Sequence, residues 1–298
     1  MSWPWIVAVL ALETISETGF VTSWRAIVDP DNLLCKGGKQ MDTRAAWAQL
    51  GGGTLVPGGS PGGVGVGAWI LHRFGMPTKL IAERQFNLSF LNTAVDAIAL
   101  ITFGVLLATG LLARRHTLTL TLIPAVLVVM GVGAVLLIAH RATPFAQRLE
   151  PKHPRVATSV TTLAAAVDDT EHLLFHRRGN RAVAGAQAYL WFDVLVLYVA
   201  FLAIHAHPAP SFAVVVLAYI VGALGGSLPL PAGLGTIAGM VGMLIVFGVA
   251  HNPALAAVLI YQAAGLLVPL VGGAIAYLLL RRKLGPAARR RPSAPRVD

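Results

Sequence analysis

The sequence predicts an all-α polytopic membrane protein built from two inverted units, each with a re-entrant hairpin that proline and glycine break. Three observations lead to this fold class. The 298 residues are 56% hydrophobic and only 12% charged, whereas about a quarter of the residues in soluble domains are charged. Several apolar runs reach the roughly 20 residues that cross a bilayer core about 30 Å thick. Two similar stretches rich in proline and glycine interrupt such runs.

The two interrupting stretches match each other along their length. The first reads VPGGSPGGVGVGA from Val56 to Ala68, and the second reads LPLPAGLGTIA from Leu228 to Ala238. Proline removes a backbone donor and glycine weakens a helix, so each stretch should break the helix that holds it. Non-helical backbone at membrane depth is tolerated only inside protein or along a watery cavity, which predicts a pathway beside both stretches. We expect the hairpins to turn at Pro57, Pro61, Gly62, Gly63, Gly65, Pro229, Pro231, Gly233 and Gly235.

The first transmembrane unit is predicted at residues 1–140. It contains a span at 3–28, the broken hairpin at 45–75, a span at 86–112 and an extra span at 117–140. The first span begins with tryptophans, which suit a membrane interface.

The second half of the chain divides into three parts. Residues 141–181 form a basic section in which apolar residues recur at helical spacing, which predicts an amphipathic helix on the membrane surface. Residues 182–284 form the second transmembrane unit, with its broken hairpin at 211–250. Residues 285–298, rich in proline, alanine and arginine, are predicted to be a disordered basic tail.

The formal net charge of +10 raises the question of nucleic-acid binding, but the basic residues lie at the ends of apolar runs. That distribution is typical of the positive-inside rule and predicts no nucleic-acid partner. The 141–181 section and the tail are the most basic segments, so both, including the C-terminus, should be cytoplasmic. The first hairpin then enters from the cytoplasmic side and the second from the outer side, as in transporters built from inverted repeats.

Four carboxylates within the spans are candidates for a substrate pathway. Glu13 and Glu17 lie four residues apart in the first span and therefore share one helix face. Asp96 and Asp193 lie in the spans that follow the first hairpin and precede the second. A carboxylate inside a membrane is costly and indicates function. Solvated helix ends and hydrogen bonds between helices are the alternative explanations.

Two arginines complete the predicted pathway. Arg25 and Arg84 lie at span ends, where a guanidinium can either hold a lipid phosphate or anchor the helix at the interface. No catalytic signature is evident, so no enzymatic activity is expected. The glycine spacing at Gly63 and Gly65 fits a loose dinucleotide pattern, but no strand precedes it. We therefore expect neither a cofactor nor a metal.

The second stretch and its flanks, Gly222 to Val249, resemble a re-entrant segment of the lysylphosphatidylglycerol synthase transmembrane region and of the wider flippase-like family. The first stretch is similar to that family's earlier counterpart, and Glu83-Arg84 to its Glu-Arg pair. The resemblance covers the membrane part alone, without the aminoacyl-transfer domain. It implies a multi-pass protein of a bacterial inner membrane that moves lipids between leaflets.

Two departures from the family pattern leave other functions open. The family often has an acidic residue at the position of Ala238 and arginine at the position of Gln262. The main hypothesis is translocation of a lipid or lipid-linked substrate, with membrane lipids as partners. One alternative is a non-transporting anchor for an envelope enzyme, and another is a small-solute transporter. A homo-oligomer is also compatible with the sequence.

Overall fold

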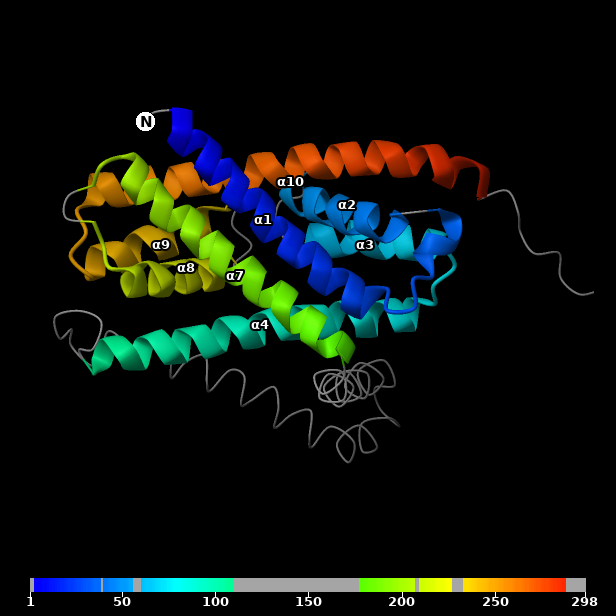
Figure 1. Ribbon diagram of the computed structural model, residues 1–298, viewed down its shortest axis with the longest axis horizontal. Helices are drawn as coiled ribbons and strands as arrows, with labels where there is room; N and C mark the ends of the chain where they lie inside the picture. The colour runs from blue at the N-terminus through cyan, green and yellow to red at the C-terminus, as the bar shows by residue number, and fades with distance from the viewer. Residues whose placement is uncertain are drawn as a thin grey trace, which may run out of the picture.

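The computed structural model describes residues 3–38, 40–55, 60–109, 177–206, 209–226 and 233–287 (Figure 1). Within these ranges every regular element is a helix, and four helices are long and apolar enough to cross a membrane. The prediction of an all-α polytopic membrane fold is therefore confirmed. The four long helices are α1 (Trp3–Val28), α4 (Thr78–Ala108), α7 (Arg177–Ala203) and α10 (His251–Ala287).

Several predicted features lie outside the described residues. They are the extra span at 117–140, almost all of the 141–181 section with its amphipathic helix, and Pro57, Pro229 and Pro231. The tail is described only to Ala287, where α10 ends, so this helix continues past the expected start of the tail at residue 285.

Helix α4 begins well before the apolar run that predicted it. Pro77, in extended conformation (φ −61°, ψ 140°), precedes the first helical residue, Thr78. The polar residues of the next two turns find partners on neighbouring helices. The Arg84 guanidinium donates to the Val28 carbonyl at 2.9 Å, and the Gln85 amide pairs with that of Gln49. A helix with such partners can continue through a polar stretch, so the span starts earlier than hydropathy indicates.

Four shorter helices form two pairs. The first pair is α2 (Met41–Leu55) with α3 (Ser60–Arg73), and the second is α8 (Phe212–Gly226) with α9 (Leu234–Val246). At 1.5 Å per residue each is about 20–23 Å long, less than a bilayer core. Figure 1 shows the first pair toward one end of the molecule and the second pair toward the other.

The described breaker residues lie at or just before the starts of helices rather than at a turn between them, and Gly235 is the second residue of α9. Pro61, Gly62, Gly63 and Gly65 belong to α3, because proline is tolerated in the first helical turn, where its missing N–H has no intrahelical partner. In the second pair Gly233 precedes α9 in a left-handed conformation (φ +68°) that suits glycine.

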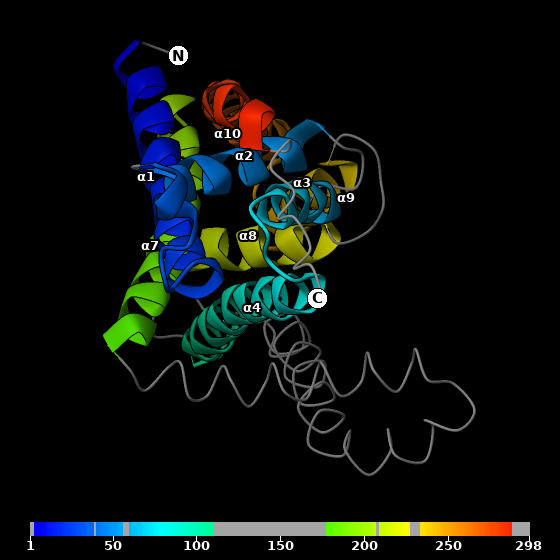
Figure 2. The same ribbon diagram turned by 90° about the vertical axis from the view of Figure 1, so that its right-hand side faces the viewer.

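Close approach of glycine backbones brings the helices together. Helix α1 packs along α7 through Gly19, where an added Cβ would lie 2.6 Å from the Tyr189 amide nitrogen. Helix α2 packs against α10 through Gly51 and Gly273. Figure 2 shows both neighbourhoods, α1 beside α7 and α2 beside α10. Each short pair thus contacts a long helix of the opposite half, since α2 packs on α10 and α8 packs on α4.

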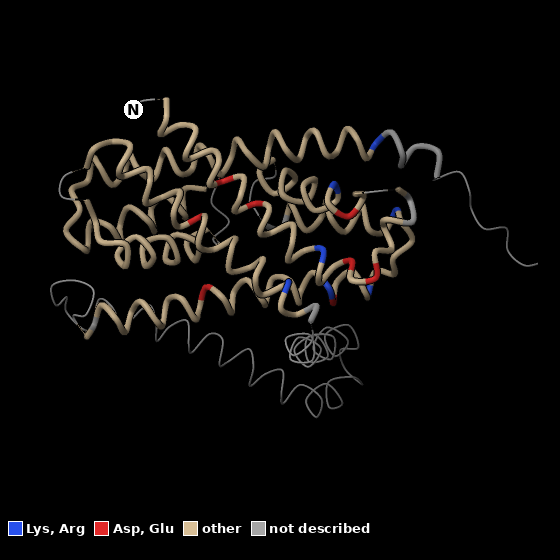
Figure 3. The backbone as a smooth tube through the Cα atoms, in the orientation of Figure 1, with Lys and Arg blue, Asp and Glu red and all other residues tan. Residues whose placement is uncertain are grey.

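Charge is unevenly distributed along the bundle. In Figure 3 the described Lys and Arg positions gather toward the end that holds α2, α3 and the start of α4, whereas several Asp and Glu positions lie near the middle of the helices. The positive-inside rule places such basic residues at the cytoplasmic end of a span, and the orientation of this chain stays a prediction.

Candidate functional site

Three of the predicted carboxylates come together between α1 and α7. Glu13 and Glu17 are buried on α1, with 3% and 4% of their surface exposed, and Asp193 is buried on α7 with 6% exposed. The side chains of Glu13 and Asp193 are in hydrogen-bonding contact, and Glu17 lies close enough to Asp193 for their charges to interact. The shared helix face predicted for the two glutamates thus points at an acid on another span.

Two tyrosines from other helices hold the aspartate in place. The hydroxyl of Tyr219 on α8 donates to Asp193 Oδ2 at 2.8 Å, and that of Tyr261 on α10 donates to the same oxygen at 3.1 Å. The two rings contact each other edge to face, with centroids 6.1 Å apart. The carboxyl group therefore ties three helices of the second half, α7, α8 and α10, to α1.

Two hydrogen bonds between the helices fix the register of α1 against α7. The Ser16 hydroxyl donates to the Tyr189 carbonyl at 2.8 Å, and the Ser23 hydroxyl donates to the Ala182 carbonyl at 2.5 Å. Both bonds require the close backbone approach that Gly19 allows. A shift of one turn would break both bonds and move one of the two glutamates out of the cluster, because Glu13 and Glu17 are themselves one turn apart.

Apart from the contact between the Glu13 and Asp193 carboxyl groups, which needs a proton on one of them, three oxygens of this cluster have no hydrogen-bond donor in the described chain: Glu13 Oε2, Glu17 Oε2 and Asp193 Oδ1. In the described part of the chain no lysine or arginine forms an ion pair with these acids. Leaving a buried acceptor unsatisfied costs about 1–3 kcal/mol, so the oxygens favour a donor from outside the described chain. We refer to Glu13, Glu17 and Asp193, with Tyr219 and Tyr261, as the carboxyl cluster.

Asp96 lies on α4 at the edge of this cluster. Its charge interacts with that of Asp193, although no hydrogen bond joins the two. One turn earlier on the same helix, the Asn92 side-chain oxygen is buried without a partner. Asp96 and Asn92 therefore extend the polar surface from the cluster toward α4.

The described residues contain no group of three metal-binding side chains close enough to hold an ion. The cluster consists instead of acceptors for hydrogen bonds, with two phenols as its donors. Its arrangement suits a positively charged group with several N–H donors.

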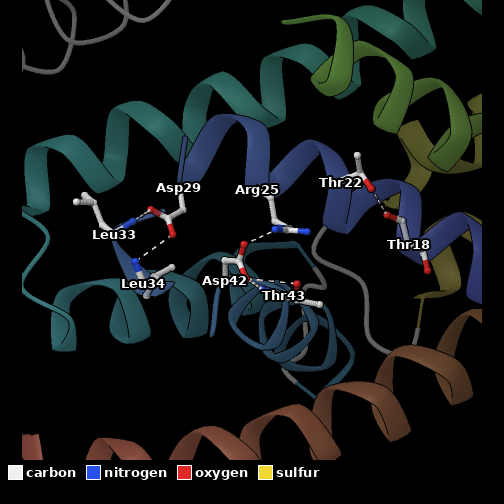
Figure 4. A network of polar contacts seen from close by, with 8 residues as sticks. All are labelled: Thr18, Thr22, Arg25, Asp29, Leu33, Leu34, Asp42 and Thr43. Carbon is white, nitrogen blue, oxygen red and sulfur yellow. Dashed lines mark hydrogen bonds and ion pairs between the residues drawn. The ribbon is translucent and has the colours of Figure 1, made fainter. Parts of the chain in front are cut away.

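The predicted arginines both have protein partners near the C-terminal end of α1, and Figure 4 shows the contact of Arg25 with Asp42. Arg25 Nε contacts Asp42 Oδ2 at 2.5 Å, and that aspartate is almost fully buried. Arg84 binds the Val28 carbonyl, and its guanidinium lies 3.5 Å from Asp31 Oδ2. Because carbonyls at a helix end lack partners within the helix, Arg84 caps α1.

Asp29 stabilises the chain reversal after α1, also visible in Figure 4. Its carboxylate accepts the backbone N–H groups of Leu33 at 2.7 Å and Leu34 at 3.1 Å, at the start of the short 3-10 helix η1 (Leu34–Gly37). Burial raises the pKa of this carboxyl above its ordinary value of 3.8, although the two N–H groups oppose the rise.

A second buried polar group is a pair of glutamines that the sequence reasoning missed. Gln49 and Gln85 exchange two amide hydrogen bonds of 3.0 and 2.8 Å, and Trp24 Nε1 donates to Gln49 Oε1 at 2.8 Å. These bonds join α1, α2 and α4. Tyr219 and Tyr261 were also missed, and the available signal was a phenol in the middle of an apolar run, where its hydroxyl needs a partner.

The positions that depart from the family pattern lie at the second helix pair. Gln262 on α10 lies beside Gly233, where an added Cβ would be 2.8 Å from the glutamine Nε2. Ala238 on α9 is exposed. The neutral amide at 262 thus contacts the backbone at the start of α9, one residue after Tyr261 of the carboxyl cluster.

Comparison with known families gives one match. The model of the family described as "Lysylphosphatidylglycerol synthase TM region" matches residues 1–273. No curated protein matches the chain. Because the matched region covers most of the sequence, the chain belongs to this transmembrane family.

Proposed function

We propose, on the premise of that family membership, that this integral membrane protein moves a lipid or lipid-linked substrate between leaflets. We further propose that the carboxyl cluster takes an amine-bearing headgroup. The proposal includes no catalytic step by the chain itself. The family's description names a lipid whose lysyl group carries amines, which agrees with the acidic character of the cluster.

The observation that carries this proposal is the set of three unpartnered oxygens on Glu13, Glu17 and Asp193. A primary ammonium has three donors and no acceptor, so it complements a site made of acceptors. Its positive charge also offsets the cost of carboxylates within a membrane. A phosphate or a neutral sugar would gain less there, because each brings acceptors of its own.

The helix arrangement supports transport rather than simple anchoring. The two short helix pairs lie toward opposite ends of the molecule, and each contacts a long helix of the other half. We infer that they are re-entrant hairpins of two inverted units. In this arrangement the carboxyl cluster lies between the two halves, where transporters of this type bind their substrates.

A leaflet-exchange assay tests the proposal. Purified protein is reconstituted into phosphatidylcholine vesicles with acyl-labelled fluorescent phosphatidylethanolamine, phosphatidylcholine or phosphatidylglycerol, and dithionite bleaches the outer leaflet. We expect the amine lipid to exchange fastest. Because a hydrogen bond to a charged group contributes about 1.5–3 kcal/mol, Glu13→Gln should slow that exchange about tenfold or more.

Glu83→Gln is the matched control. Glu83 lies outside the carboxyl cluster, at the start of α4 beside Lys79, and its neutralisation should leave exchange unchanged. Equal rates for wild type and Glu13→Gln, with both proteins monodisperse, would remove the cluster from the mechanism. No acceleration of any lipid would instead contradict translocation and favour the anchor hypothesis.

A further inference from the structure

An apolar groove lies between α2, α3 and α10. Its volume is about 670 Å³, and residues along its walls include Leu55, Trp69, Leu270 and Leu278. This volume lies within the range of about 300–1,000 Å³ typical of small-molecule sites. None of the carboxyl-cluster residues lines the groove, so it is a separate feature of the molecule.

Missing side chains create the groove. Gly51 and Gly273 bring α2 and α10 into backbone contact on one side. On the α3 side, a Cβ added at Gly65 would meet no atom within 4 Å. The space beside Gly65 is therefore open, and a larger residue there would fill the groove without a clash.

Aromatic and cationic residues mark one mouth of the groove. Trp69 and Tyr277 line it, and the Arg73 guanidinium lies over the Trp69 ring, 5.4 Å from its centroid. Arg281 follows Tyr277 by one helical turn on α10 and is exposed. Tryptophan, tyrosine and arginine gather where a membrane protein meets the headgroup layer.

The two arginines lie at the same mouth because α3 and α10 run in the same direction. Contacts of Trp47 with Gly272 and Gly273, and of Gly51 with Pro269 and Gly273, show that α2 is antiparallel to α10. Helix α3 returns along α2, as the approach of Gly63 to the Gln49 carbonyl shows, so it is parallel to α10. In the described residues no carboxylate forms an ion pair with either arginine.

We propose that this groove binds a phospholipid with an anionic headgroup. One acyl chain lies along the apolar wall past Gly65, and the phosphate end meets Arg73 and Arg281. Guanidinium groups bind phosphate oxygens through two parallel hydrogen bonds. The site is opposite in charge preference to the carboxyl cluster, so it holds a different lipid from the one proposed for translocation, and it does not depend on translocation.

The charges favour a lipid over a second copy of the chain. In a symmetric dimer through this face Arg73 and Arg281 would approach their own counterparts, and like charges that meet across an interface oppose association. An anionic headgroup neutralises them.

Fluorescence quenching in lipid nanodiscs tests the proposal. Full-length protein is placed in phosphatidylcholine nanodiscs that contain either phosphatidylglycerol or phosphatidylcholine brominated on acyl carbons near the headgroup. The Trp69 signal is obtained by subtracting the spectrum of Trp69→Phe. We expect brominated phosphatidylglycerol to quench Trp69 at a lower mole fraction than brominated phosphatidylcholine.

Variants distinguish the two parts of the site. Arg73→Gln and Arg281→Gln should each reduce the preference for phosphatidylglycerol about fivefold, whereas Arg181→Gln, at the start of α7 and also exposed, should leave it unchanged. Gly65→Leu should abolish quenching by both lipids. Its control is Gly242→Leu on α9, where an added Cβ also meets nothing within 4 Å.

Two results would overturn the proposal. Equal quenching by the two lipids, unaffected by the arginine variants, would show that the groove has no headgroup preference. Absence of quenching, together with a dimer that Gly65→Leu dissociates in size-exclusion chromatography with light scattering, would show that a second copy fills the groove. Neither result would bear on leaflet exchange, which depends on the carboxyl cluster.

Discussion

The contact between α2 and α10 allows a quantitative prediction about Gly273→Ala. A Cβ at this position would lie 2.5 Å from the Gly51 Cα and 2.8 Å from both the Gly51 nitrogen and the Trp47 carbonyl oxygen. Carbon atoms normally pack at about 3.5–4.0 Å, so the two helices must separate by about 1 Å. All three atoms belong to the backbone, and none can rotate away.

The expected loss of stability follows from two opposing effects. Overpacking of this kind costs about 1–3 kcal/mol, and the fixed backbone on both sides places Gly273→Ala near the upper limit. Alanine returns up to about 1 kcal/mol through its higher helix propensity. We therefore expect the free energy of unfolding to fall by about 2 kcal/mol.

Gly65→Ala is the matched control, because it makes the same chemical change inside a helix with no atom within 4 Å of the new Cβ. Here only the gain in propensity remains, so this variant should be stabilised by up to about 1 kcal/mol. The two alanine variants should then differ by about 3 kcal/mol, roughly a hundredfold in the unfolding equilibrium.

Equilibrium unfolding in mixed micelles, followed by circular dichroism as the denaturing detergent is increased, measures both values. A Gly273→Ala protein at least as stable as wild type would refute the argument, because α2 and α10 would then not be in backbone contact. A double variant with Gly51→Ala should cost less than the sum of the single variants, since one separation of the helices relieves both clashes.

Three further predictions concern the carboxyl cluster and the cytoplasmic end of the bundle. Tyr219→Phe removes the 2.8 Å hydrogen bond to Asp193 and should lower the free energy of unfolding in the same assay by about 0.6 kcal/mol; an unchanged value would show that the bond contributes nothing. Burial raises the pKa of Asp29 in the folded protein, so folding favours its protonated form. The stabilisation from this preference is fully present below pH 3.8 and is lost as pH rises through the folded-state pKa. Asp29→Asn should therefore gain stability relative to wild type from acid to neutral pH, and parallel melting temperatures at all pH values would contradict this. An impermeant maleimide should label Cys35, the single cysteine, in inverted vesicles but not in intact cells, and labelling of intact cells would reverse the predicted orientation.

Much of the fold is determined by local properties of the sequence. The hydrocarbon core requires long apolar segments with all backbone groups bonded internally, so hydropathy alone located the four long helices and the two interrupted regions. The family was also evident from the second stretch, since its prolines and glycines occupy fixed positions in a short segment. Helical periodicity likewise placed Glu13 and Glu17 on one face, and the structure shows both of them buried.

The tertiary structure decided which side chains meet. Tyr261 contacts Asp193 across 68 residues of sequence, and Gln49 contacts Gln85 across 36. Helical periodicity does not predict contacts between residues so far apart in the sequence. The same holds for helix contacts: glycine backbones at Gly19 and Gly51 let α1 approach α7 and α2 approach α10, but a small residue in the sequence does not name its partner. Burial of an acid is thus a local consequence of the membrane, whereas its neighbours are set by the packing of whole helices.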